Sequence, residues 1–226
     1  RREPLVLRPD ADRVPVRAEL LARAADEGEA AGAVRQLERL AHLLARFGDP
    51  VAPDDAGVGA DVLRAYRELI AEGKMPVRIY AMIGGDGALW REYLAKGPEV
   101  GEFLTVRAIK LMGDGALGSR GAALWQPYTD DKQNTGLLVT PKEVIERVSR
   151  EAAAKGFQVA TDAIGDRTNR IVLDAYAAAL GGKNDKRFRV EHAQIVSLPD
   201  FKMFADYSVV ASIQATHATS DMRWAE

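Results

Sequence analysis

The residue of this chain best suited to chemistry is Lys110, which lies inside the apolar run AIKLM just ahead of a glycine-rich segment. An ammonium group is not left unpaired in a dry interior, so Lys110 must reach solvent, pair with a carboxylate, or give up its charge. A lysine that loses its proton can add carbon dioxide and become a carbamate, an anionic group able to bridge metal ions. From this residue alone, pairing with Asp114 or another carboxylate near the strand end is the favoured hypothesis.

Further polar side chains stand where the expected strands end. After the strands expected at 157–161, 188–192 and 209–214, the candidates are Asp162, His192, His217 and Asp221. The carboxyl ends of parallel strands share one edge of a sheet, and α/β folds place their functional groups there. Histidine, carboxylate and modified lysine are the ligands left to a hydrolytic zinc ion when cysteine is absent. The sequence therefore predicts a metal site at this edge.

Each candidate also has a structural alternative. A lone histidine is more often structural, although the position of His192 at a strand end puts the ligand hypothesis slightly ahead. His217 is either a substrate contact or proton carrier, or a loop histidine that caps a helix. Asp166 is expected to be the N-cap of the helix that follows, whereas Asp162, directly after its strand, remains a catalytic candidate. His42 is expected to pack or to face solvent.

Alternating helix and strand patterns position these residues. The expected helices are 16–47 (one or two), 61–72, 90–95, one opened by Thr140-Pro141, 166–180 and 200–206, and the further strands are 77–83 and 106–112. Thr140 with Glu143 indicates a capping box, and Pro53 beside two aspartates indicates a loop or a damaged strand. Sustained alternation predicts a parallel sheet with helical cover, and the missing dinucleotide and phosphate-loop glycine patterns favour a barrel over a doubly wound sheet.

Composition narrows the function classes. The chain has 226 residues, of which 47% are hydrophobic, so it can bury a sizeable core. Its 31 basic and 33 acidic residues give no electrostatic footprint for nucleic acid or an anionic membrane. The absence of cysteine excludes disulfides, and no run has the length of a membrane span or the apolar core of a signal peptide. We expect a soluble, cytoplasmic protein that acts on a small molecule.

Five segments together resemble the amidohydrolase superfamily, in its YtcJ-like branch, amidohydrolase family 3. They are AIKLMGDGALGSRGAAL, PYTDDKQNTGLL, GFQVATDAIGDRTNRIVLDAY, RFRVEHAQIV and SIQATHATSDM, and the resemblance runs from Asp55 to Glu226. It implies an α/β fold, a distorted (β/α)8 TIM barrel with a metal-dependent hydrolytic site, in a family that includes enzymes hydrolysing the C–N bond of N-substituted formamides.

The resemblance also assigns roles to residues. Lys110 matches the strand-four lysine that can be carboxylated, and His192 matches the strand-six metal ligand, while Asp162 takes the strand-five place where the family has histidine. The implied cofactor is a divalent metal, with zinc expected, as one or two ions. We expect His217 and Asp221 to be the catalytic groups. The expected substrate contacts are Asp114, Ser119, Arg120 and Gln214.

Other family features are missing from the sequence. Nothing resembles the strand-one His-X-His pair, the chain stops at Glu226 before the strand-eight aspartate, and the small N-terminal β-sandwich domain is absent. The expectation is one partial barrel over 1–226, about strands two to seven, with a helical lead-in at 1–48. An open barrel exposes sheet edges, so we expect a homo-oligomer or a complementing fragment.

Two functions follow as hypotheses. The first is a metal-dependent hydrolase that cleaves amide-like C–N bonds with metal-activated water. The second is a catalytically inactive, truncated barrel that serves as a small-molecule-binding or assembly module. Metal content discriminates between the two, because the enzyme needs an ion and the module does not.

Overall fold

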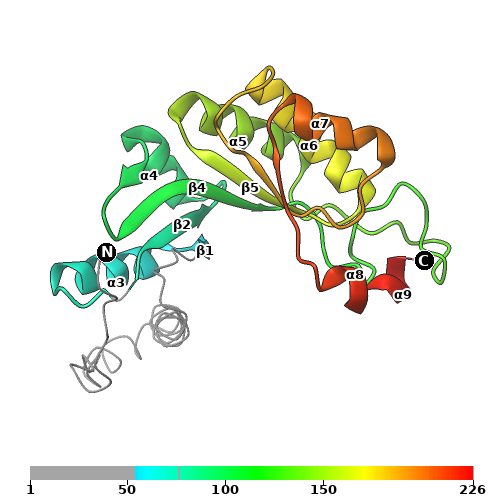
Figure 1. The fold of residues 1–226 in the computed structure, drawn as a ribbon, viewed down its shortest axis with the longest axis horizontal. Coiled ribbons are helices and arrows are strands. Elements are labelled where there is room, and N and C mark those ends of the chain that lie inside the picture. The colour runs from blue at the N-terminus through cyan, green and yellow to red at the C-terminus, as the bar shows by residue number, and fades with distance from the viewer. Residues whose placement is uncertain (1–53, 76, 226) are drawn as a thin grey trace, which may run out of the picture. The chain divides into compact units, whose positions relative to one another are not determined.

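A computed structural model describes residues 54–75 and 77–225, and it divides the chain into two compact units. The described part of the first unit contains helix α3 (Ala60–Ala71), which buries Val62, Leu63, Tyr66 and Leu69. The second unit holds the sheet and the remaining helices (Figure 1). The helical lead-in predicted at 1–48, with His42, lies outside the described residues.

The second unit is built on a mainly parallel sheet with the strand order β1-β2-β4-β5-β6-β7. The strands are β1 (Asp54–Val58), β2 (Ile79–Gly84), β4 (Leu104–Met112), β5 (Gln158–Ala163), β6 (Arg189–His192) and β7 (Val210–Ser212), with β3 (Glu99–Val100) antiparallel to β4. The helices are α4 (Ala88–Lys96), α5 (Lys142–Lys155), α6 (Asp166–Leu180), the 3-10 turn η1 (Leu198–Asp200), α7 (Phe201–Asp206), α8 (His217–Ser220) and α9 (Met222–Ala225). This arrangement confirms the predicted parallel α/β class.

The sheet curves so that β1 and β6 approach each other across one face. Arg189 on β6 binds Asp54 on β1 at 2.7 Å between Nη1 and Oδ2, although β2, β4 and β5 lie between the two strands. In a flat sheet β1 and β6 would be roughly 19 Å apart, four strand spacings. An arginine side chain cannot span that distance, so the sheet is an arc with a concave face, as in a partial barrel.

The two faces of the sheet carry different side chains because residues alternate along each strand. Thr161 faces the covering helices, since the hydroxyl of Tyr176 on α6 donates to its Oγ1 at 2.8 Å. Its neighbours Ala160 and Asp162 therefore face the concave side. Ala160 packs there with Met82 and Ala108, while α5, α6 and α7 cover the other face (Figure 1). The concave face is thus the surface on which a site can form.

Three local predictions need correction or refinement. The capping box is wrong, because Thr140 donates its hydroxyl to the carbonyl of Met112 at 2.6 Å and α5 starts two residues later. Gly165, and not Asp166, is the N-cap of α6, while Asp166 accepts the N–H groups of Trp125 and Arg167. The segment after Pro53 forms β1, a short strand at the end of the sheet, which suits a sequence too polar for its centre.

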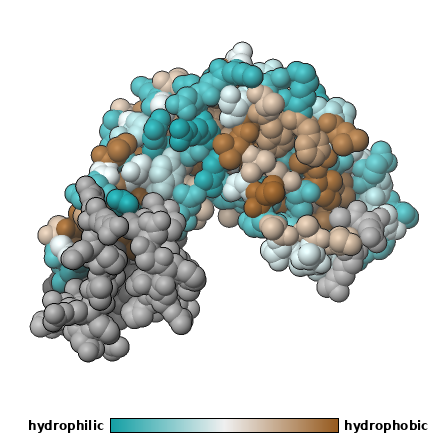
Figure 2. Space-filling model, in the orientation of Figure 1, coloured by the Kyte–Doolittle hydropathy of each residue, from teal (hydrophilic) through white to brown (hydrophobic). Residues whose placement is uncertain are grey.

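Apolar side chains are exposed around β7, the end of the sheet opposite β1. Val210 on β7 is 42% exposed and Ile213, just after it, is 70% exposed. Figure 2 shows apolar groups gathered on this side of the second unit, over α7 and the neighbouring strand.

Among the described residues, no helix is both long and apolar enough to cross a membrane.

Candidate functional site

Three neighbouring strands bring Lys110, Asp162 and His192 together at their carboxyl ends. Lys110 Nζ on β4 donates to Asp162 Oδ1 on β5, and His192 Nε2 on β6 lies 3.2 Å from the same oxygen. The side chains are 12%, 16% and 26% exposed in that order, so water reaches the cluster only in part. The ion pair favoured for Lys110 therefore forms, and its partner is Asp162. Its other suggested partner, Asp114, is occupied elsewhere.

Within the cluster of Lys110, Asp162 and His192, the hydrogen bond between Asp162 and His192 favours the charged form of each. Burial alone would raise the pKa of Asp162, but its hydrogen bonds with His192 and Lys110 outweigh burial, so the pKa lies below its ordinary value of 3.8. The hydrogen bond with Asp162 raises the pKa of His192 above 6.5, and the contact with Gln214 adds to this against the opposing effect of burial. The carboxylate is thus ionised near neutral pH, and the pKa of His192 lies above its ordinary value.

His192 is held in an unusual backbone conformation. Its φ is 72° and that of Ala193 is 42°, so two consecutive residues with β-carbons occupy the left-handed region. Each such residue costs on the order of 1–3 kcal/mol and persists only where its surroundings enforce it, which is common at functional sites. Here the turn aims the imidazole back toward Asp162.

The ring of His192 is oriented in the way that suits a metal ligand. Nδ1 lies 2.9 Å from Oε1 of Gln214. An amide oxygen can only accept, so Nδ1 carries the proton and the lone pair of a neutral ring is on Nε2, which points at Asp162. The 3.2 Å between Nε2 and Oδ1 is close to the roughly 3.3 Å that separates two donors on one tetrahedral zinc ion.

The donor set is nevertheless small. No group of three or more His, Cys, Asp or Glu side chains that could hold a metal occurs in the described ranges. Asp162 and His192 supply two donors. The Lys110 ammonium has no lone pair and cannot be a third, whereas its carbamate would offer carboxylate-like oxygens. The residues therefore fit a metal ion on condition that Lys110 is modified.

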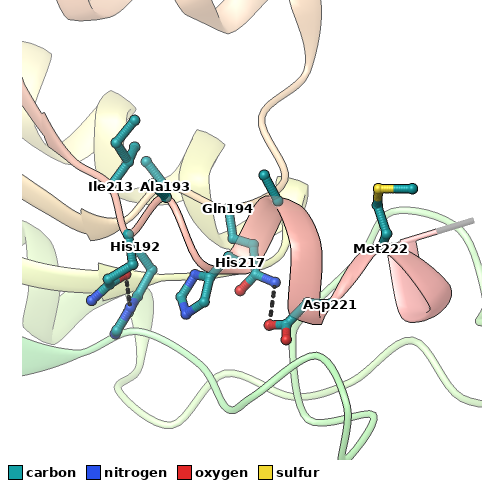
Figure 3. A pocket seen from close by; sticks show the side chains of 10 residues that line it. His192, Ala193, Gln194, Ile213, His217, Asp221 and Met222 are labelled. Carbon is teal, nitrogen blue, oxygen red and sulfur yellow. Dashed lines mark hydrogen bonds between the residues drawn. The ribbon is translucent and has the colours of Figure 1, made fainter.

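A cavity of about 260 Å³ opens beside His192 (Figure 3). Its wall includes His217, whose ring centroid is 5.7 Å from that of His192, and Asp221, which accepts a hydrogen bond from Nε2 of Gln194 at 2.9 Å. Nδ1 of His217 is buried and has no hydrogen-bond partner within the described part of the chain. The rest of the lining is apolar except for Gln214. The apolar residues are Ala193, Ile213, Ala215, Ala218 and Met222.

The sequence matches the model of the amidohydrolase family over residues 11–226. The chain belongs to the amidohydrolase family. It is 32% identical over 181 residues to YtcJ of Bacillus subtilis, described as an amidohydrolase, and the match covers 80% of this chain. It is also 38% identical to the protein LONG AFTER FAR-RED 3 of Arabidopsis thaliana over 57% of the chain, and 28% identical to an N-substituted formamide deformylase of Arthrobacter pascens over 78%.

Solved structures agree with this membership. A crystal structure of an uncharacterized metal-dependent hydrolase from Pyrococcus horikoshii matches 74% of the chain with a TM-score of 0.64 and 31% identity. This amidohydrolase-family chain spans only 22%, 32% and 35% of the three curated relatives and 34% of that structure. It corresponds to about a third or less of each.

Three of the four predicted substrate contacts of this amidohydrolase-family chain do not line the cavity. Asp114 is 5% exposed, and its two oxygens accept the N–H groups of Ala123, Ile164 and Gly165, so its contacts hold loops together. Arg120 binds Asp130 through two nitrogens, at 3.0 and 2.6 Å. Ser119 donates to the carbonyl of Ala116 at 3.1 Å. Gln214 lines the cavity, and the substrate roles of all four residues stay predictions.

Sequence reasoning missed two residues next to the site. Gln194 lies two positions after His192 and fixes Asp221, and an amide so close to a candidate ligand was a usable signal. Asn169 is fully buried on α6 and donates to three carbonyls around the strand ends. Nothing in the sequence marks Asn169, because its partners come from distant turns.

Proposed function

We propose that this chain carries part of the metal site of a hydrolase that cleaves amide-like C–N bonds of small molecules. The observation that supports the proposal most is the convergence of Lys110, Asp162 and His192 beside a cavity. The relatives' names agree with it, since they include an amidohydrolase, an N-substituted formamide deformylase and a metal-dependent hydrolase.

Asp162 and His192 would hold a divalent metal, with zinc the expected ion. Nε2 of His192 offers its lone pair once the ring is neutral, and Gln214 keeps the ring in that tautomer. The amine of Lys110, once deprotonated, would add carbon dioxide to form a carbamate, with release of the amine proton. Bound there, a divalent ion supplies Lewis acidity to a carbonyl oxygen and a nucleophilic water at neutral pH.

The remaining residues would bind substrate and move protons. The largely apolar lining of the cavity suits an uncharged amide with an apolar substituent. His217 stands close enough to the cluster to carry a proton to the leaving nitrogen, and Gln194 keeps Asp221 turned toward the cavity. Hydrolysis of an amide yields a carboxylate and an amine, so a proton must reach that nitrogen.

Hydrolysis of a panel of N-substituted formamides and simple amides tests this function. The chain is dialysed with Zn²⁺ and bicarbonate, and formate and amine release are measured. We expect turnover that needs the metal and falls at least about 100-fold in Lys110→Met and His192→Gln, which lose ligands. Arg189→Met, at the opposite end of the same strands, is the matched control. Turnover that is unchanged without metal, or in both ligand variants, would contradict the proposal.

A second candidate function is a non-catalytic binding or assembly module. The specific observation in its favour is that Lys110, Asp162 and His192 already satisfy one another as ion pairs, without an ion. The exposed apolar groups at β7 would suit self-association or a complementing segment. Light scattering after size exclusion tests the assembly, and a monomer at low micromolar concentration would count against it.

A further inference from the structure

Asn169 makes an unusual set of hydrogen bonds from the first turns of α6. Its side chain is fully buried, and Nδ2 lies 3.0 Å from each of the carbonyl oxygens of Ala163, Gly165 and Ile195. Carbonyl oxygens only accept, so the amide presents its nitrogen to all three and shares its two hydrogens among them. The orientation of Asn169 is therefore fixed by its surroundings.

The three carbonyls belong to two separate turns. Ala163 and Gly165 lie in the turn that follows Asp162, and Ile195 lies in the turn that follows His192. The same turns also meet directly, because the N–H of Ile195 donates to the carbonyl of Ile164 at 2.9 Å. Asn169 thus joins the segments that carry the two halves of the Asp162–His192 pair.

The two turns depend on Asn169 to different degrees. The turn after Asp162 has other anchors, since Asp114 accepts the N–H groups of Ile164 and Gly165. At the start of the other turn, His192, the last residue of β6, and Ala193 are both left-handed and strained, so the surrounding structure must enforce their conformation. Beyond the β5–β6 ladder, which pairs His192 with Ala163, Ile195 links this turn to the neighbouring one, since its N–H donates to Ile164 and its carbonyl accepts from Asn169. Removal of the amide should therefore release His192 more than Asp162.

We propose that Asn169 is a positioning residue, which ties the turn after His192 to the turn after Asp162 and so aims the imidazole at the carboxylate. This inference rests on the proposed function only in taking Asp162 and His192 as the site. The hydrogen bonds of the Asn169 amide go to backbone carbonyls and not to the side chains of Asp162 or His192, so it acts through the backbone.

Nuclear magnetic resonance of the metal-free 226-residue chain, labelled with ¹⁵N-histidine, tests the proposal. The probe is the Nδ1–H of His192, which donates to Gln214, and His192→Gln assigns its signal. In Asn169→Ala we expect exchange of this proton with water to accelerate about tenfold or more, or the signal to vanish, because the donor geometry loosens. Asn184→Ala is the matched control, since Asn184 likewise donates to two carbonyls, of Gly182 and Tyr207, away from the site.

The outcomes separate positioning from a general loss of stability. An accelerated His192 signal in Asn169→Ala with an unchanged one in Asn184→Ala supports the proposal. Equal exchange in wild type and a folded Asn169→Ala overturns it. If Asn169→Ala does not fold, Asn169→Ser, which keeps a hydroxyl for the nearby Gly165 carbonyl, takes its place. If both fail to fold while Asn184→Ala folds, Asn169 is a folding residue and the proposal is wrong. Because no metal or substrate is added, failure here is distinct from failure of the proposed hydrolysis.

Discussion

The concave face of the sheet carries a charged cluster at each end of its strands, and the two clusters are built in opposite ways. At the carboxyl ends, one carboxylate, Asp162, is shared by Lys110 and His192. At the amino ends, one guanidinium, Arg189, is shared by Asp54 at 2.7 Å and Glu191 at 2.6 Å. Each end also borders a cavity, of about 260 Å³ and about 480 Å³ respectively, so a hollow alone does not distinguish them.

The difference lies in what the shared groups can become. A guanidinium stays charged at any physiological pH and cannot bind a metal, so the Arg189 cluster has one state. An imidazole and an amine can lose protons, after which one ligates metal and the other reacts with carbon dioxide. His192, moreover, is itself one of the strained residues. We infer that the amino-end cluster stabilises the curved sheet and that the carboxyl-end cluster carries the chemistry.

The largest effect on stability is expected for Asp162→Asn. The substitution leaves the Lys110 ammonium without its carboxylate partner in a site that is less than 30% exposed, and it removes the group that raises the pKa of His192. We expect a loss of about 3 kcal/mol in the free energy of unfolding, as for a buried ion pair that loses one partner. Urea unfolding measures it. Asp174→Asn, which affects an exposed pair on α6, is the control and should change stability by about 0.5 kcal/mol or less. Equal effects of the two substitutions would contradict the prediction.

Arg189→Met is expected to have a smaller effect. It leaves Glu191 largely buried without its partner, but Asp54 is 38% exposed and regains water. We therefore predict a loss of about 1–2 kcal/mol in unfolding free energy, less than for a fully buried pair. Urea unfolding and metal affinity are measured on the same sample. Metal affinity should not change, and a clear drop would mean that the two ends of the sheet are coupled.

The smallest effect expected is a pH dependence of stability that arises from the carboxyl-end cluster. The pKa of His192 is raised in the folded chain, so its contribution is complete below its ordinary value of 6.5 and is lost as the pH rises through the folded value. The pKa of Asp162 is lowered, so its contribution is lost only in acid. The unfolding free energy of wild type minus that of His192→Gln should thus shrink from about pH 5 to about pH 9, by about 1 kcal/mol or less. A difference that grows with pH would contradict the assigned ion pair.

The sequence predicts which residues meet at the site better than it predicts the long-range contacts and backbone conformations around them. Strand alternation alone places Lys110, Asp162 and His192 at one edge, because the ends of neighbouring parallel strands converge. It cannot foresee that Arg189 binds Asp54, 135 residues away, since that contact depends on how far the sheet curves. The capping prediction for Thr140 failed for the same reason: the local pattern is present, but a carbonyl 28 residues distant takes the hydroxyl. Left-handed φ at His192 is equally hidden, because only glycine signals it in sequence.

The most direct measurement of the central claim is calorimetric titration of the chain with Zn²⁺ in bicarbonate buffer, beside His192→Gln and Arg189→Met. We predict that wild type and Arg189→Met bind at least one ion per chain with equal affinity, and that His192→Gln binds at least about 100-fold more weakly. Absence of binding to wild type, or equal binding to His192→Gln, would show that the carboxyl ends of β4, β5 and β6 do not form a metal site.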